Sequence, residues 1–189
     1  AYAGYILITD SLKSGSKEAI VQLRALGITR VAMLSGDSKT SAETVGAELG
    51  ISEVHHSLLP QDKVALLDSM LSPRARLAFV GDGINDAPSL ARADVGVAMG
   101  ALGSDAAIEA ADIVLMDDNP LKLPLAIRIA RKTLRIAKQN AVFAIGVKAL
   151  VMVFSVIGIG SLWYAVFADV GVTILAVLNA MRTLKREKA

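Results

Sequence analysis

The 189-residue chain contains no cysteine. This absence excludes a disulfide framework and any metal site built on thiolates within these residues. Aromatic residues are also scarce, at 4% of the sequence, and they are not interleaved with the basic residues. Nucleic-acid-binding surfaces typically combine cations with stacking aromatics, so we expect no nucleic-acid partner.

Acidic residues are almost missing from the last third of the chain. Residues 1–120 carry 9 Lys and Arg against 16 Asp and Glu, whereas residues 121–189 carry 11 against 2. The mean hydropathy of the whole chain is +0.52, which is high for a soluble protein. An acidic part joined to a basic, apolar part predicts a membrane protein with a cytosolic domain.

The start of the chain shows neither an initiator methionine nor a signal-peptide pattern. We therefore expect the chain to be a fragment of a longer protein. Its length leaves room for one domain and an appendage, and no internal repeat or low-complexity tract is visible.

Short apolar runs alternate with helical patterns over the first 116 residues. Strands are predicted at residues 5–9, 31–34, 53–56, 77–80, 95–99 and 113–116. Helices are predicted at residues 16–26, 38–49 and 106–110, and from residues 60 and 85 onward. This order predicts an α/β fold with a parallel sheet covered on both faces.

The most informative stretch is residues 81–88, Gly-Asp-Gly-Ile-Asn-Asp-Ala-Pro, directly after a predicted strand. Its two glycines permit the tight turn from strand to helix. Asn85 or Asp86 can cap that helix, and Pro88 fits its first turn. The stretch is therefore predicted to form a strand–turn–helix unit.

Asp82, Asn85 and Asp86 should then cluster at the carboxyl end of a parallel strand, where open α/β sheets bind ligands. Carboxylate and amide oxygens suit Mg²⁺. An ordinary loop rich in turn residues is the alternative, but two acids and an amide within five positions favour the metal site.

Further polar residues follow other predicted strands: Asp10 follows the first, and Ser35, Gly36 and Asp37 follow the second. Lys63 lies near the start of a helix. A hydroxyl, a lysine and Mg²⁺-binding acids at one sheet edge indicate phosphoryl transfer, which depends on positioning and charge neutralisation. A nucleophile is missing, because no base accompanies Ser35.

Residues 141–181 contain only two charged residues, Lys148 and Asp169. Residues 158–161 divide this segment into two stretches near the ~20 residues that a bilayer crossing requires. Basic residues flank both stretches: Arg128, Arg131, Lys132, Arg135 and Lys138 before the first, and Arg182, Lys185, Arg186 and Lys188 after the second. This pattern places both ends in the cytosol, with a buried hairpin of a soluble protein as the alternative.

These observations divide the chain into four segments. We expect a cytosolic domain at residues 1–119 and a basic cytosolic or interfacial helix at 120–140. Two transmembrane helices are expected at 141–181 and a basic cytosolic tail at 182–189. In an antiparallel hairpin the depths of Lys148 and Asp169 differ by five residues, or roughly 7–8 Å, so the two side chains can pair.

Three motifs resemble the second half of the phosphorylation domain of P-type ATPases, which has the haloacid-dehalogenase-like fold. Residues 33–37 resemble the T-G-D motif with Ser for Thr, and residues 59–63 resemble P-x-x-K. Residues 81–88 match G-D-G-x-N-D-x-P, the most specific of the three. The resemblance covers essentially the whole chain.

The tail is similar to the last two membrane helices of the heavy-metal class, in its Zn²⁺/Cd²⁺/Pb²⁺ branch. The residues that carry this similarity are Asn140, Lys148, 162–163, 169–171 and 179–182. The resemblance implies an ATP-driven cation exporter that cycles through an aspartyl-phosphate and resides in the plasma membrane as a multi-pass protein.

The resemblance also implies residue roles. Asp82 and Asp86 would hold Mg²⁺ with support from Asn85, Lys63 and Ser35 would contact the phosphoryl group, and Gly36 and Asp37 would lie by the nucleotide phosphates. Asp10 with Lys13 resembles a D-x-x-R/K position, a weaker match. In the membrane, Asp169 would join upstream thiolates in binding Zn²⁺, Cd²⁺ or Pb²⁺, with Lys148 as a counter-charge that helps to expel the ion. A purely structural pair is the alternative.

The chain departs from the family pattern in one decisive respect. The phosphorylated Asp of D-K-T-G-T is absent, as are the nucleotide-binding domain and the transmembrane Cys-Pro-Cys. The fragment alone should not hydrolyse ATP, and its expected partners are the lipid bilayer and the rest of the same ATPase chain. A non-catalytic membrane-anchored module and a membrane-anchored phosphatase are the alternatives.

Overall fold

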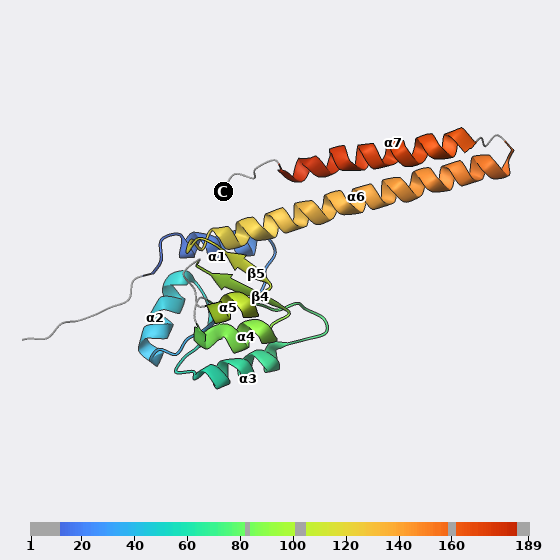
Figure 1. Cartoon of the computed structure of the whole chain (residues 1–189). Coiled ribbons are helices and arrows are strands. Elements are labelled where there is room, and N and C mark those ends of the chain that lie inside the picture. Colours follow the sequence, from blue (N-terminus) through green and yellow to red (C-terminus); the bar gives the residue numbers. More distant parts are fainter. Residues whose placement is uncertain (1–11, 82–83, 101–104, 159–161, 185–189) are drawn as a thin grey trace, which may run out of the picture. The chain divides into compact units, whose positions relative to one another are not determined.

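The computed structural model describes residues 12–81, 84–100, 105–158 and 162–184 (Figure 1). The chain forms two compact units, Ala1–Pro124 and Leu125–Ala189. Asp10, Asp82 and the strand predicted at residues 5–9 lie outside the described residues.

The first unit has the predicted alternation of strands and helices. Its helices are α1 (Ser16–Ala25), α2 (Lys39–Leu49), α3 (Pro60–Met70), the short η1 (Ile84–Asp86), α4 (Ala87–Arg92) and α5 (Asp105–Ala110). Its strands are β1 (Ala32–Leu34), β2 (Glu53–His55), β3 (Ala78–Gly81), β4 (Val95–Met99) and β5 (Ile113–Leu115). Every element predicted within the described residues is present, with bounds shifted by one or two residues.

The described strands pair in parallel, as predicted, but they form two sheets. One sheet has the order β1-β2 and the other the order β3-β4-β5. The sequence did not predict this division, because an apolar run indicates a strand but not its neighbours.

The core of the first unit lies between α4, β4 and α5. Leu90, Ala98 and Ala107 are almost fully buried there. Gly96 permits the close approach of α4, because a Cβ at this position would lie 2.5 Å from the carbonyl oxygen of Leu90. This packing fixes α4, and with it the preceding η1, against the sheet that carries residue 81.

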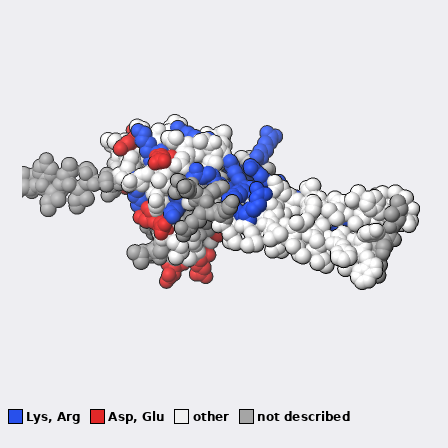
Figure 2. Space-filling model, turned by 90° about the horizontal axis from the view of Figure 1, so that it is seen from above, with Lys and Arg blue, Asp and Glu red and all other residues white. Residues whose placement is uncertain are grey.

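The second unit is a helical hairpin. Helix α6 (Lys122–Val156) contains the basic segment and the first predicted span in one continuous helix, and α7 (Leu162–Ala180) is followed by η2 (Met181–Leu184). Both long helices are apolar enough to cross a membrane, and at most 6% of their most apolar stretches is buried. Figure 2 shows a large surface without charge, as expected for helices that face lipid.

An ion pair connects the two strands of the β1-β2 sheet. Arg30, just before β1, donates two hydrogen bonds to the carboxylate of Glu53 in β2, at 2.8 and 2.6 Å. These bonds are the main reason why the pKa of Glu53 falls from 4.5 to about 2. Because the folded-state pKa is lowered, the pair stabilises the fold above pH 4.5 and loses this effect as the pH falls toward 2.

We therefore expect Glu53→Gln to unfold at a lower temperature than the parent at neutral pH. The difference should shrink as the pH is lowered below 4.5, the ordinary pKa of this carboxyl. Thermal unfolding over a pH series measures it, with Arg30→Gln as the matched variant that removes the same pair. A difference that stays constant or grows toward acid pH would contradict the linkage.

Candidate functional site

The turn after β1 presents Ser35, Gly36 and Asp37. The Ser35 hydroxyl donates a hydrogen bond to Oδ2 of Asp37 at 2.7 Å, and the backbone N–H of Asp37 donates to Oγ of Ser35 at 3.1 Å. Ser35 is buried, whereas Gly36 and Asp37 are exposed. The turn therefore fixes the hydroxyl and presents the carboxylate and backbone to solvent.

The loop after β2 holds this turn against the start of α3. The N–H of Leu58 donates to the carbonyl of Ser35 at 3.1 Å, and the N–H of Ser57 donates to the carbonyl of Asp37 at 2.8 Å. At the helix start, Asp62 accepts a hydrogen bond from the N–H of Leu59 at 3.0 Å. The motif that ends in Lys63 is thus attached to the Ser35–Asp37 turn by backbone hydrogen bonds.

Lys63 reaches from α3 to Asp86 at the junction of η1 and α4. Its Nζ lies 2.7 Å from Oδ1 of Asp86, and the two side chains are only 16% and 14% exposed. Gly81 leaves room for this carboxylate, since a Cβ there would lie 2.9 Å from Oδ2 of Asp86. Two of the three sequence motifs therefore meet in one partly buried ion pair, and the third is attached to the chain just before α3 by backbone hydrogen bonds.

The sequence allows either Asn85 or Asp86 to cap α4, and the structure bears this out for the position of Asp86 but not for a side-chain hydrogen bond. Asp86 occupies the N-cap position of α4, but its side chain makes no capping hydrogen bond, and Pro88 lies in the first turn as predicted. The carboxylate points to Lys63 instead. The Lys63 ammonium and the N–H groups of the helix terminus compete for the same charged carboxylate, and in the structure this carboxylate pairs with the ammonium.

The residues fit part of a magnesium site. Lys63 contacts Oδ1 of Asp86, while Oδ2 accepts no hydrogen bond from the described residues. Asn85 is exposed beside it, and Asp82 lies outside the described residues. Within the described ranges no group of three or more His, Asp or Glu gathers to hold a metal ion. A site with so few oxygen ligands from the protein suits Mg²⁺, because this ion usually keeps several of its bound waters.

Lys13 has a partner that the sequence did not indicate, Asp118 near the end of the first unit. Its Nζ forms an ion pair with Asp118, 2.7 Å away and 105 residues later in the chain. The D-x-x-K pattern gave no signal for this contact, because it depends on how the start of α1 packs near the end of the unit.

In the hairpin, Lys148 of α6 and Asp169 of α7 form an ion pair at 3.1 Å. Both side chains are about two-thirds exposed within the structure, at 68% and 67%. A charged residue in a membrane helix is costly, and such residues are functional by default. The pair thus presents an accessible carboxylate within the apolar part of the hairpin.

A second interhelical contact was not predicted as such. Asn140 donates to the carbonyl of Ala176 at 3.0 Å and accepts a hydrogen bond from Asn179 at 2.7 Å. Asn179 in turn accepts a hydrogen bond from Arg182 at 2.9 Å. This network fixes the register of α6 against α7, and so helps to set the relative depth of Lys148 and Asp169. The only sequence signal was the presence of amides in apolar helices.

Comparisons with known proteins show which proteins this chain resembles. The model of the haloacid dehalogenase-like hydrolases matches residues 1–94. The chain is 58% identical over 187 residues to a cadmium, zinc and cobalt-transporting ATPase of Bacillus subtilis, and 53% identical over 186 residues to a zinc-transporting ATPase of Synechocystis. These alignments cover 97% of this chain, and 27% and 26% of the two relatives.

The structural comparison agrees. A crystal structure of a zinc-transporting PIB-type ATPase in the E2.Pi state superimposes with a TM-score of 0.87 at 40% identity. The superposition covers 93% of this chain, including parts of both units, and 28% of the chain in the crystal structure. The chain belongs to the heavy-metal P-type ATPases. It spans about a quarter of the length of the family members it matches, which agrees with the expectation of a fragment.

Proposed function

We propose that this chain is the part of an ATP-driven Zn²⁺, Cd²⁺ or Pb²⁺ exporter that supplies phosphate-site residues and one portion of the membrane ion site. The observation that carries the proposal is the Lys63–Asp86 pair, attached to the Ser35–Asp37 turn in a chain that also holds Lys148 and Asp169 in apolar helices. The names of the similar proteins, transporters of cadmium, zinc and cobalt, support the substrate class.

In the phosphoryl site, each side chain has a distinct task. The Lys63 ammonium neutralises negative charge on the transferring group, and its contact with Asp86 keeps it in place when that group is absent. The Ser35 hydroxyl donates a hydrogen bond to phosphoryl oxygen by exchanging its present acceptor on Asp37. Gly36 and Asp37 face solvent, where they are open to the nucleotide phosphates.

Asp86 and Asp82, with Asn85 nearby, would hold Mg²⁺, which supplies charge neutralisation for phosphoryl transfer. Asp10 is proposed to contribute to binding the same phosphate and Mg²⁺ groups. The aspartyl nucleophile, the ATP-binding domain and the other membrane helices must come from the rest of the same ATPase chain.

In the membrane, Asp169 provides one oxygen ligand for a borderline divalent ion, and thiolates elsewhere in the full-length protein complete the site. Lys148 pairs with Asp169 when the ion is absent. Because the ammonium competes with the ion for the same carboxylate, it favours release. We propose that both ends of this fragment lie in the cytosol and that the full-length protein resides in the plasma membrane.

The purified 189-residue chain is expected to bind Mg²⁺ weakly and to hydrolyse no ATP. The reason is that the acid cluster lacks an aspartyl nucleophile. Phosphate release is measured with and without Zn²⁺, and the full-length protein serves as the active control. ATP hydrolysis by the fragment that Asp82→Asn abolishes would contradict this division of labour and favour an independent phosphatase.

A further inference from the structure

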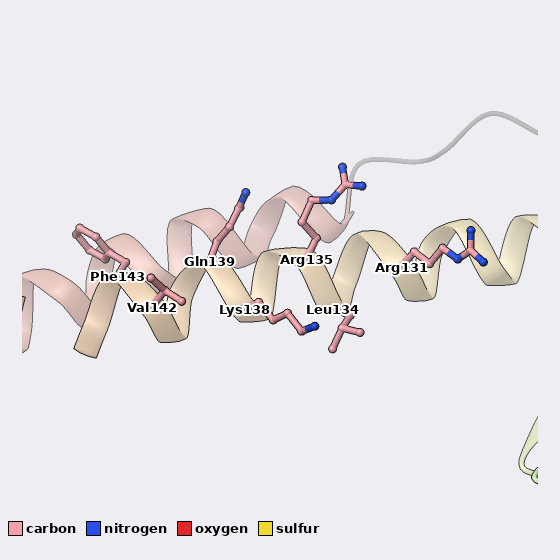
Figure 3. A pocket seen from close by; sticks show the side chains of 7 residues that line it. All are labelled: Arg131, Leu134, Arg135, Lys138, Gln139, Val142 and Phe143. Atoms are coloured by element: carbon pink, nitrogen blue, oxygen red, sulfur yellow. The ribbon is translucent and has the colours of Figure 1, made fainter. Parts of the chain in front are cut away.

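We propose that the basic end of α6 carries a binding site for an anionic phospholipid. A shallow groove of about 750 Å³ runs along this helix. Its lining contains three cations, Arg131, Arg135 and Lys138, followed by the apolar side chains of Val142 and Phe143; Leu134 and Gln139 complete it. All seven residues come from α6, with the cations toward its start (Figure 3).

The spacing along the helix matches the layers of a bilayer. If the hydrocarbon begins near Ala141, Lys138 lies about 4–5 Å and Arg135 about 9 Å outside it along the helix axis. The headgroup layer of one leaflet is about 5–8 Å thick, so Lys138 falls within this layer. Arg135 lies at its outer edge and can reach back with its long side chain.

The apolar end of the groove continues into the hydrocarbon. Val142 follows Lys138 by one helical turn, and Val142 and Phe143 are 72% and 43% exposed. A lipid phosphate at Arg135 and Lys138 would therefore place an acyl chain along these two side chains. The groove matches both parts of a phospholipid, which a soluble anion does not.

The acids described in the hairpin are too few to pair with Arg135 and Lys138. Among the described residues from 125 to 184, Asp169 is the only acid, and Lys148 already occupies it. Asp169 lies 34 positions from Arg135 in sequence and belongs to the other helix. No carboxylate described in this unit is therefore available to Arg135 and Lys138, and a lipid with net negative charge complements these two cations better than a zwitterionic one.

The proposal requires the hairpin to cross a membrane, but it does not depend on ion transport. The test uses the full-length protein in vesicles of phosphatidylcholine alone and of phosphatidylcholine mixed in equal parts with phosphatidylglycerol. The amount of phosphatidylglycerol that stays bound during extraction is measured by native mass spectrometry. Each cation near the surface contributes about fivefold in affinity, so Arg135→Gln/Lys138→Gln should weaken retention by about 25-fold.

The control variant is Lys17→Gln/Arg74→Gln, which removes the same charge at two exposed positions of the first unit. It should retain phosphatidylglycerol like the parent, and millimolar inorganic phosphate should not displace the lipid. Equal retention by the groove variant and the parent would overturn the proposal, and so would displacement by inorganic phosphate. Loss of metal-stimulated ATPase activity with unchanged lipid retention would also count against it, because the groove would then serve contacts within the protein.

Discussion

Full-length protein with Asp169→Ala should lose its Zn²⁺- and Cd²⁺-stimulated ATPase activity. The substitution removes the only carboxylate described in the hairpin, and with it the proposed oxygen ligand of the transported ion. Placing an Asp or a Lys at the centre of a membrane helix costs about 2.5–3.5 kcal/mol each on insertion scales, so a pair of this kind is expected to have a function. ATPase activity measured against metal concentration tests the prediction.

A purely structural pair makes a different prediction. Replacing a buried ion pair by apolar residues of similar size is often neutral or stabilising. If Lys148 and Asp169 only hold the helices together, Lys148→Met/Asp169→Leu should fold and keep its metal response. If Asp169 binds the ion, this double variant should fold and lose the response.

Thr173→Val is the matched control for Asp169. Its hydroxyl donates to the backbone carbonyl of Asp169 at 2.8 Å, one turn along the same helix, and the substitution preserves its shape. Metal stimulation should persist in this variant. Unchanged stimulation by Zn²⁺ and Cd²⁺ in Asp169→Ala would rule out the proposed ion ligand.

Lys63→Met in the full-length protein should reduce the rate of phosphoenzyme formation by about 10²–10³-fold, the typical loss when one preorganised electrostatic group is removed. Methionine preserves most of the volume of the side chain but leaves the Asp86 carboxylate, 14% exposed, without its cation. Asp82→Asn is expected to give a loss of similar size. Phosphoenzyme formation from radiolabelled ATP measures both.

Lys39→Met removes the same charge at the start of α2, where the lysine is 66% exposed and 3.8 Å from Glu43. This control should form phosphoenzyme at the parental rate, because weak surface pairs contribute little. Circular dichroism checks that all variants are folded. Normal phosphoenzyme chemistry in Lys63→Met would exclude the charge-neutralising role.

The sequence was sufficient to predict the elements that carry the site. Continuous apolar runs located β3, β4 and β5, and glycine and proline at 81–88 indicated the turn before α4. These features are local, since they depend on the conformational preferences of a few neighbouring residues. The same holds for the hairpin, whose length and flanking charges can be counted directly.

The side-chain partners could not be predicted in the same way. By sequence alone Asp86 is equally suited to cap its own helix, and the packing of α4 on β4 brings it to Lys63, 23 residues earlier in the chain. The pairing of Lys13 with Asp118 and of Asn140 with Asn179 likewise depends on tertiary packing. Depth in the bilayer made the contact of Lys148 with Asp169 possible to anticipate, because membrane spans impose a common scale on both helices.

The metal selectivity of the full-length protein tests the central claim most directly. ATPase activity should be measured with Zn²⁺, Cd²⁺, Pb²⁺ and Cu⁺ separately, under conditions that keep free metal buffered. A site that includes the Asp169 carboxylate suits borderline divalent ions, so Zn²⁺, Cd²⁺ and Pb²⁺ are expected to stimulate and Cu⁺ is not. Stimulation by Cu⁺ alone would contradict the assignment of this chain to a divalent heavy-metal exporter.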